Sequence, residues 1–385
     1  MPLMFHNFIA HGTQGLYEAT QVSGAPTIVS DPAKFLGYAC QMDAGEEFWF
    51  SDVDSGEVSQ GDWLGYDFWI NFQDKVPSSL ETLLSVHGSV ASTDDWNLRI
   101  DTDSDLEVYD STQTLLGTVT DPFTVDDWHR IQIQYQQLAS GAFKMWVDKQ
   151  LVVDETGKDL AGSADWPTGA WYLNNRGIQF TWDGFYHLSG GSGNLSDFID
   201  DPDFLGPFQN TAEDATDQGT PLDTGAWNDT GEMPFNDSNV GIYTGGSAKA
   251  GHTRFDEGAR LGPGAFPGTV YAYKGIFRSR KPATVAATVH NHRLGSLSPP
   301  STENYTDYPH TPNTSISTTR IVRSSQDAPA DGDYLLMGMT IDAGGEGFEV
   351  GEVCGFILTD AVVAVEGMLG GVGRGVGRGV MEGVG

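Results

Sequence analysis

The strongest constraint on the fold is the alternation of apolar and polar side chains in short segments. Residues 129–138 read HRIQIQYQQL, which places Ile131, Ile133 and Tyr135 on one side of an extended chain and polar side chains on the other. A period of two residues is that of a β-strand with one face in a core and the other in water. The segment therefore predicts a half-buried strand.

The same pattern recurs, with turn signals in between, over residues 15–190. It is found in residues 61–72, in 96–110 as two runs separated by a polar turn, and in 178–188. The composition agrees, because 49 Gly and 18 Pro residues favour short strands and turns over long helices. We therefore predict an all-β protein whose first part is a two-sheet sandwich.

The 385 residues are enough for two or three domains. A Gly/Ser/Asp-rich stretch at 189–208 indicates a domain boundary, and paired strands are predicted beyond it at 268–280 and 284–294. We predict four parts: a concanavalin A-like jelly roll over 1–190, a linker over 191–210, a second β-sandwich over 211–365 that docks to a particle, and a Gly/Val/Arg tail over 366–385.

Acidic residues outnumber basic ones by 53 to 20, which gives a formal net charge of −33. Nucleic acid is not expected as a partner, because phosphate binding needs clustered Lys and Arg. No stretch of about 18 apolar residues occurs, so membrane insertion is not expected, and neither is a secretory signal. The excess of Asp over Lys suits a halophilic setting or, alternatively, an acidic surface that resists aggregation.

The predicted hairpin carries a family likeness. The strings WHRIQI at 128–133 and FKMWVD at 143–148 resemble the laminin-G-like, concanavalin A-like jelly-roll family, in which the tryptophan opens one strand and the Val-Asp pair lies at the turn after the next. Lys149 stands where that family usually has Gly, so we expect the turn to be built differently. The resemblance implies a jelly roll and says little about a ligand.

The order of the segments carries a second likeness. The joint DFIDDPDFLGPFQ at 197–209, an Asp/Thr-rich stretch and then GTVYAYKGIFRSRK at 268–281 are similar to the two-domain architecture of tailed-virus structural proteins. This resemblance implies a virion structural protein on the particle exterior, on the capsid surface or at a tail fibre or tip, assembled in the host cytoplasm and released by lysis. The partners it implies are other virion proteins, copies of the chain itself in a homo-oligomer, and a host envelope glycan.

Motifs for catalysis are missing from the sequence. A glycan hydrolase needs two carboxylates facing each other across a sugar, and the Glu-x-Asp-x-Glu string that would place them on one strand face does not occur. There is no Gly-x-Ser-x-Gly elbow and no His-Glu-x-x-His motif. We therefore predict no catalytic residue and no enzymatic activity. A polysaccharide-degrading enzyme or a free-standing lectin on the same fold are the alternatives.

Glycan binding would use aromatic rings and planar polar side chains on loops or on a concave face. The segment ADWPTGAWYLNNRG at 164–177 supplies Trp166, Trp171, Asn174 and Arg176. These four residues are the predicted glycan site, although most tryptophans of such a chain belong in the core.

Two further sets of residues are candidates for binding. Asp101, Asp103 and Asp105 lie between two apolar runs, where they are either solvated turn carboxylates or ligands for Ca²⁺ as a cofactor. Arg374 and Arg378 lie in the Gly-rich tail, where we expect them to meet the acidic surface of a neighbouring subunit and so support assembly.

Overall fold

The computed structural model describes the chain as strands and turns. It covers residues 3–5, 21–24, 26–35, 39–51, 61, 63–87, 94–161, 170–175, 177–189, 198–199, 202–208, 241–243, 249–255, 270–280, 290–298, 302–310, 317–324, 334–341 and 348–359. Within these ranges there is no helix, and hence none that is long and apolar enough to cross a membrane. Every strand pairing in them is antiparallel. The all-β prediction is confirmed.

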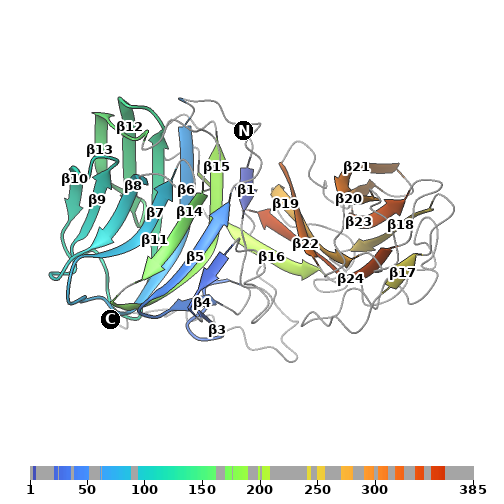
Figure 1. Cartoon of the computed structure of the whole chain (residues 1–385), viewed down its shortest axis with the longest axis horizontal. Helices are drawn as coiled ribbons and strands as arrows, with labels where there is room; N and C mark the ends of the chain where they lie inside the picture. Colours follow the sequence, from blue (N-terminus) through green and yellow to red (C-terminus); the bar gives the residue numbers. More distant parts are fainter. Residues whose placement is uncertain are drawn as a thin grey trace, which may run out of the picture.

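Two sheets form the first sandwich, drawn in blue and green in Figure 1. The eight-stranded sheet runs in the order β13 (Gln150–Lys158), β12 (Gly141–Val147), β11 (Trp128–Gln136), β6 (Trp63–Asp74), β15 (Gln179–Ser189), β4 (Ala39–Met42) and β3 (Thr27–Val29), with β1 (Leu3–Phe5) also paired to β15. The seven-stranded sheet runs in the order β10 (Leu115–Val119), β9 (Leu106–Asp110), β8 (Asp94–Ile100), β7 (Glu81–His87), β14 (Ala170–Asn175), β5 (Glu46–Ser51) and β2 (Gln21–Ser23).

Two further sheets follow in the second part of the chain (Figure 1). One consists of β16 (Asp203–Phe208), β24 (Phe348–Thr359), β19 (Val270–Arg280) and β22 (Ser317–Ser324), with β17 (Gly241–Tyr243) on β24. The other consists of β18 (Lys249–Phe255), β23 (Tyr334–Ile341), β20 (His290–Ser298) and β21 (Thr302–His310).

The second part differs from the prediction in two respects. The strands expected at 268–280 and 284–294 do not pair with each other, because β19 pairs with β22 and β24 whereas β20 pairs with β21 and β23 in the other sheet. The predicted linker over 191–210 contains β16, which pairs with β24. The domain boundaries themselves stay a prediction.

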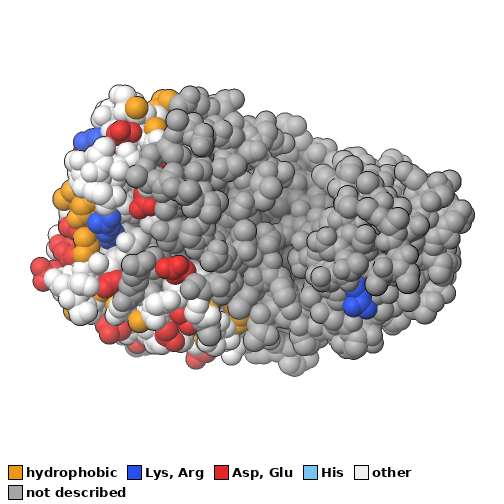
Figure 2. Space-filling model, in the orientation of Figure 1, with side chains coloured by type: hydrophobic (Ala, Val, Ile, Leu, Met, Phe, Trp, Pro, Cys, Tyr) orange, Lys and Arg blue, Asp and Glu red, His pale blue; other side chains and the backbone are white. Residues whose placement is uncertain are grey.

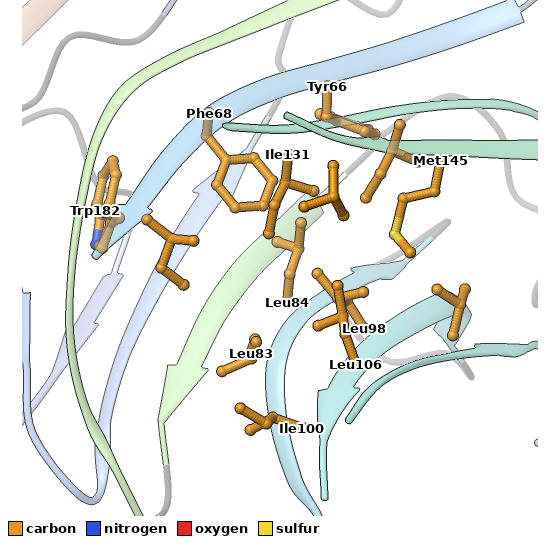
Figure 3. Packing of buried hydrophobic residues seen from close by; sticks show 14 of the residues in the cluster. Tyr66, Phe68, Leu83, Leu84, Leu98, Ile100, Leu106, Ile131, Met145 and Trp182 are labelled. Atoms are coloured by element: carbon orange, nitrogen blue, oxygen red, sulfur yellow. The ribbon is translucent and has the colours of Figure 1, made fainter. Parts of the chain in front are cut away.

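The core of the first sandwich lies between its two sheets. Its largest fully buried apolar side chains include Trp96, Trp182, Tyr135 and Phe68. Figure 3 shows Phe68, Tyr66, Ile131 and Met145 facing Leu84, Leu98 and Leu106 of the opposite sheet. Burying such side chains contributes about 1.5–3 kcal/mol each, so this alternation of apolar residues determines which face of each strand points inward.

The hairpin with the family likeness forms as predicted, from β11, β12 and β13. Its second turn is made by Asp148 and Lys149, and both residues have positive φ, 49° and 69°. Two such residues in a row are typical of a type I′ turn, which normally favours Asn or Gly. Asp148 also accepts hydrogen bonds from the backbone N–H of Arg130 at 2.8 Å and from His129 Nδ1 at 2.7 Å. These bonds hold the turn in place without a glycine.

Candidate functional site

The outer face of the eight-stranded sheet, which points away from the seven-stranded sheet, carries polar side chains that are buried. Asp67, Asn71, Arg130, Gln132 and Gln134 are each at most 5% exposed. The alternation in β11 predicted that its polar side would be wet, and that prediction is wrong. Burial of so many polar groups is costly unless each finds a partner, so the arrangement on this face needs an explanation.

Asp67 is the centre of a hydrogen-bonded group that we call the Asp67 cluster, made of Asp67, Arg130, Gln132 and Tyr186. Arg130 Nε donates to Asp67 Oδ1 at 3.0 Å, and Arg130 Nη2 donates to Oδ2 at 2.5 Å. Gln132 Nε2 and the Tyr186 hydroxyl also donate to Oδ2, at 2.9 Å and 2.6 Å. The strands β6, β11 and β15 are neighbours in the sheet, and their register brings these four residues together.

The electrostatics of the cluster follow from burial. The pKa of Asp67 is raised because burial penalises its charged form, an effect that the Arg130 guanidinium opposes. Burial and the neighbouring Asp67 raise the pKa of Tyr186 well above its usual value. The phenol is therefore a hydrogen-bond donor at neutral pH and not a base. Arg130 also lies over the Trp69 ring, 4.8 Å from its centroid, which adds a cation–π contact.

Two short segments cover the cluster and its surroundings. Phe35 packs edge-on against Trp69, with ring centroids 5.0 Å apart. Phe198 and Ile199 are 5% and 4% exposed, and Arg130 Nη2 donates to the backbone carbonyl of Ile199 at 2.6 Å. These segments account for part of the burial that the alternation did not predict.

Asp183 holds the first of these segments. On β15 it lies directly across from Trp69, and its carboxylate accepts backbone N–H bonds from Lys34 at 3.0 Å, Phe35 at 2.7 Å and Gly184 at 2.6 Å. Burial raises the pKa of Asp183 to about 8, although the three N–H donors act in the opposite direction. The next residue, Gly184, has φ of +61°, and a Cβ there would collide with the Phe35 ring and lie 3.1 Å from Trp69.

The variant Gly184→Ala is expected to lower the free energy of unfolding by about 2–3 kcal/mol, from left-handed backbone strain plus the collision. Gly45→Ala is the matched control, because Gly45 also has positive φ, +87°, but open space around its missing Cβ. Gly45→Ala should lower the free energy of unfolding by only about 1 kcal/mol. Urea unfolding followed by tryptophan fluorescence measures both variants. Equal losses would mean that Phe35 does not pack closely on this glycine.

Some buried polar atoms of this outer face remain without a hydrogen-bond partner in the part of the chain that the structure describes. They are Gln132 Oε1, Gln134 Oε1 and Asn71 Nδ2. Buried amide atoms rarely stay unpaired, and in a native protein they indicate a water, an ion or a ligand at that place. We call these three residues the amide row.

Known proteins resemble this chain at the level of solved structures. No family model and no curated protein matches the chain. Similar solved structures are an endo-β-1,4-glucuronan lyase from the fungus Trichoderma reesei (12% identity, 48% of this chain and 94% of that one, TM-score 0.35), alginate lyase Aly36B in complex with an alginate trisaccharide (10%, 48% and 97%, 0.34), and a carbohydrate esterase from the Shiga toxin-encoding bacteriophage φ24B (15%, 45% and 90%, 0.32). The likeness is one of fold.

The sequence motifs predicted that the chain is not an enzyme, and that prediction is wrong by this comparison, since the similar structures include polysaccharide lyases. Motif searches look for short strings. The Asp67 cluster instead draws on three strands, so its members lie far apart in the sequence.

The structure does not describe the side chains of the four predicted glycan-binding residues. Trp166 and Arg176 lie outside the described residues, and Trp171 and Asn174 are in β14, of which only the backbone is described there. β14 is flanked on both sides by strands β5 and β7. The predicted assembly residues, Arg374 and Arg378, also lie outside the described residues. All these roles stay predictions.

The three aspartates of the predicted calcium site lie in the turn between β8 and β9, as expected for a hairpin. Asp101 Oδ1 accepts backbone N–H bonds from Asp103 and Asp105, each at 2.9 Å, while Asp105 Oδ1 accepts one from Asp121 at 3.0 Å. Within the described ranges, no group of three or more His, Cys, Asp or Glu residues is placed to hold a metal ion. These carboxylates order the turn, and Ca²⁺ binding stays a prediction.

Proposed function

We propose that the first sandwich recognises a polysaccharide and acts on it at the outer face of the eight-stranded sheet. The observation that carries the proposal is the amide row, which shares Gln132 with the Asp67 cluster. Planar amides present a donor and an acceptor at once, which suits pairs of sugar hydroxyls. Trp69 and Trp146 lie on the same face and are 7% and 5% exposed, so apolar rings accompany the polar groups, as in small-molecule sites generally.

The charges favour a neutral glycan over a polyuronide. Arg130 is already paired with Asp67, so a bound uronate would add an uncompensated buried charge. Lys144, directly across from Gln134, has Asp154 opposite it on the next strand. The chain as a whole carries −33 and repels polyanions. Figure 2 shows acidic side chains over the described part of the first sandwich, with fewer basic ones among them.

Binding can be tested on the full chain with a panel of soluble polysaccharides, comprising neutral glucans, mannans and N-acetylated glycans together with alginate and glucuronan. We expect a neutral member to bind, and Gln134→Ala to weaken that binding about tenfold, because one hydrogen bond in a buried site is lost. Gln150→Ala, at the exposed first position of β13, is the matched control. Equal affinity of Gln134→Ala and the unmodified chain in calorimetry would contradict the proposal.

Cleavage of the bound glycan is a second candidate function, favoured by two buried carboxyls on this face. Asp67 and Asp183 lie on the adjacent strands β6 and β15, and burial raises the pKa of both. Asp183, whose pKa burial raises to about 8, is protonated near neutral pH and can serve as a general acid, and glycosidases use such a residue with a second carboxylate, the role left to Asp67 in its ion pair with Arg130. New reducing ends in the same panel would support this function. Their appearance with an unsaturated product would instead indicate elimination.

The place of the chain on a virus particle remains a proposal that rests on the order of its segments. If the protein is a virion component, the glycan bound at this face is one of the host envelope. Co-purification of the chain with assembled particles tests whether it belongs to them. Immunogold labelling of intact particles then tests whether it lies on their exterior.

A further inference from the structure

The segment Phe198–Ile199 makes specific contacts with the Asp67 cluster. Beside the bond from Arg130 Nη2 to its carbonyl at 2.6 Å, the Ile199 N–H donates to the Tyr186 hydroxyl oxygen at 3.2 Å. The Phe198 ring meets Trp146 edge-on at 6.0 Å and Tyr186 at 6.4 Å, measured between ring centroids. One residue of backbone and one ring thus contact Arg130 and Tyr186 of the cluster and the neighbouring Trp146.

These contacts are of the kind that a sugar unit makes. Ile199 offers an acceptor to a guanidinium and a donor to a phenol oxygen, as neighbouring oxygen substituents of a sugar ring do. Phe198 supplies the apolar surface that lies against Trp146. Gln132 Oε1, within the same cluster, is left without a partner in the described residues. The segment therefore occupies the cluster without satisfying it completely.

The cluster does not depend on the segment for its own geometry. Asp67 receives its hydrogen bonds from Arg130, Gln132 and Tyr186, all on strands of the sheet. Departure of Ile199 would free one N–H of Arg130 and one lone pair of Tyr186 and leave the other bonds in place. The site is thus formed in advance, and only its occupant would change.

We propose that Phe198–Ile199 is an intramolecular occupant of the glycan site, and that docking of this segment and binding of a sugar unit exclude each other. This inference rests on the proposed function, because it names the regulation of that same site. The affinity measured for a glycan is then the intrinsic affinity reduced by the fraction of molecules in which the segment is released.

The double variant Phe198→Ser/Ile199→Gly of the full chain tests the inference without altering Arg130, Tyr186 or the amide row. We expect it to bind the neutral glycan of the panel at least tenfold more tightly than the unmodified chain. Val76→Ser/Leu80→Ser, which changes two exposed apolar residues elsewhere, is the control and should leave the affinity unchanged. Near-UV circular dichroism checks that each variant is folded, and Ile199→Gly alone serves if the double variant is not.

A second readout on the unmodified chain does not depend on variants. Chymotrypsin cleaves after aromatic residues, so glycan binding should accelerate cleavage after Phe198 at least several-fold. If the variant is cleaved rapidly there but binds no more tightly, while Gln134→Ala still loses binding, the inference is overturned and the proposed function stands. If neither the released variant nor the unmodified chain binds any glycan of the panel, the proposed function fails and the inference fails with it.

Discussion

Replacing Arg130 by methionine is expected to lower the free energy of unfolding of the first sandwich by about 3–5 kcal/mol. The substitution leaves the Asp67 carboxylate fully buried, with hydrogen bonds from Gln132 and Tyr186 but no positive charge beside it. It also removes the donor to the Ile199 carbonyl. Breaking one half of a buried ion pair costs more than the pair contributes, because the remaining charge is still without its water and has lost its oppositely charged partner.

A double-mutant cycle separates the ion pair from general packing. Asp67→Leu/Arg130→Met removes both charges, and it should recover a large part of the stability that either single variant loses. Lys158→Met is the control for loss of a surface charge, since the Lys158–Glu155 pair at 3.0 Å is partly exposed and should change stability by less than about 1 kcal/mol. Urea denaturation followed by tryptophan fluorescence gives all four values. A double variant as unstable as the sum of the two single losses would contradict the ion-pair account.

Replacing Asp95 by asparagine is expected to stabilise the protein by on the order of 3–4 kcal/mol at pH 7 and to have little effect at pH 4. Burial raises the pKa of Asp95 to about 8, while the Gln137 amide that donates to its Oδ2 at 2.6 Å opposes that shift. The folded state therefore holds this proton far more tightly than the unfolded chain, whose aspartates titrate near 3.9.

The sign of the pH dependence follows from this difference. Below about pH 4 the Asp95 carboxyl is protonated in both the folded and the unfolded state, so its ionisation does not lower the free energy of unfolding. Between about pH 4 and 8 the unfolded state releases the proton and the folded state does not, so stability falls by about 1.4 kcal/mol per pH unit. Asparagine keeps an acceptor for Gln137 and carries no such proton. The difference in the free energy of unfolding between the variant and the unmodified chain should therefore grow as the pH rises and become constant above about pH 8.

Unfolding by urea at several pH values between 4 and 9 measures the gap between the two proteins. Asp183 contributes equally to both, so the difference isolates Asp95. Asp103→Asn, at an exposed turn position, should show a gap below about 0.5 kcal/mol at every pH. A constant gap for Asp95→Asn across this range would show that the carboxyl is already ionised in the folded protein.

The sequence predicted the strands of the first sandwich well and their surroundings poorly. Ile131, Ile133 and Tyr135 alternate with polar residues, and all three side chains lie in the core. The strand and the face that it buries could therefore be predicted from the sequence. Arg130 and Gln132 occupy the alternate positions, and polar residues there normally face water. Only the fold shows that they are covered, since the covering residues, among them Ile199, lie far along the chain.

The candidate site was missed for a related reason. Asp67 stands between Tyr66 and Phe68 and reads as one more outward polar residue of a strand. Its partners Arg130 and Tyr186 are brought beside it by strand register, which no short motif records. A signal was present nonetheless: an acidic residue and a basic residue occupy polar positions of two segments that were both predicted as strands. In the second part of the chain, β19 and β20 were predicted to pair because they are adjacent in sequence, and the structure assigns them to different sheets.

The pairing of β6 with β15 also has a consequence for the order of events during synthesis. Phe180 pairs with Phe72, more than a hundred residues earlier in the chain, so the eight-stranded sheet cannot close until translation has passed its middle strands. Contacts of such long sequence separation form slowly. Phe198 leaves the ribosome nine residues after Ser189 ends β15, about 0.5–2 s later at usual elongation rates. A nascent chain therefore completes the Asp67 cluster and its cover almost together, which limits the time in which the open face can meet other proteins in the cell.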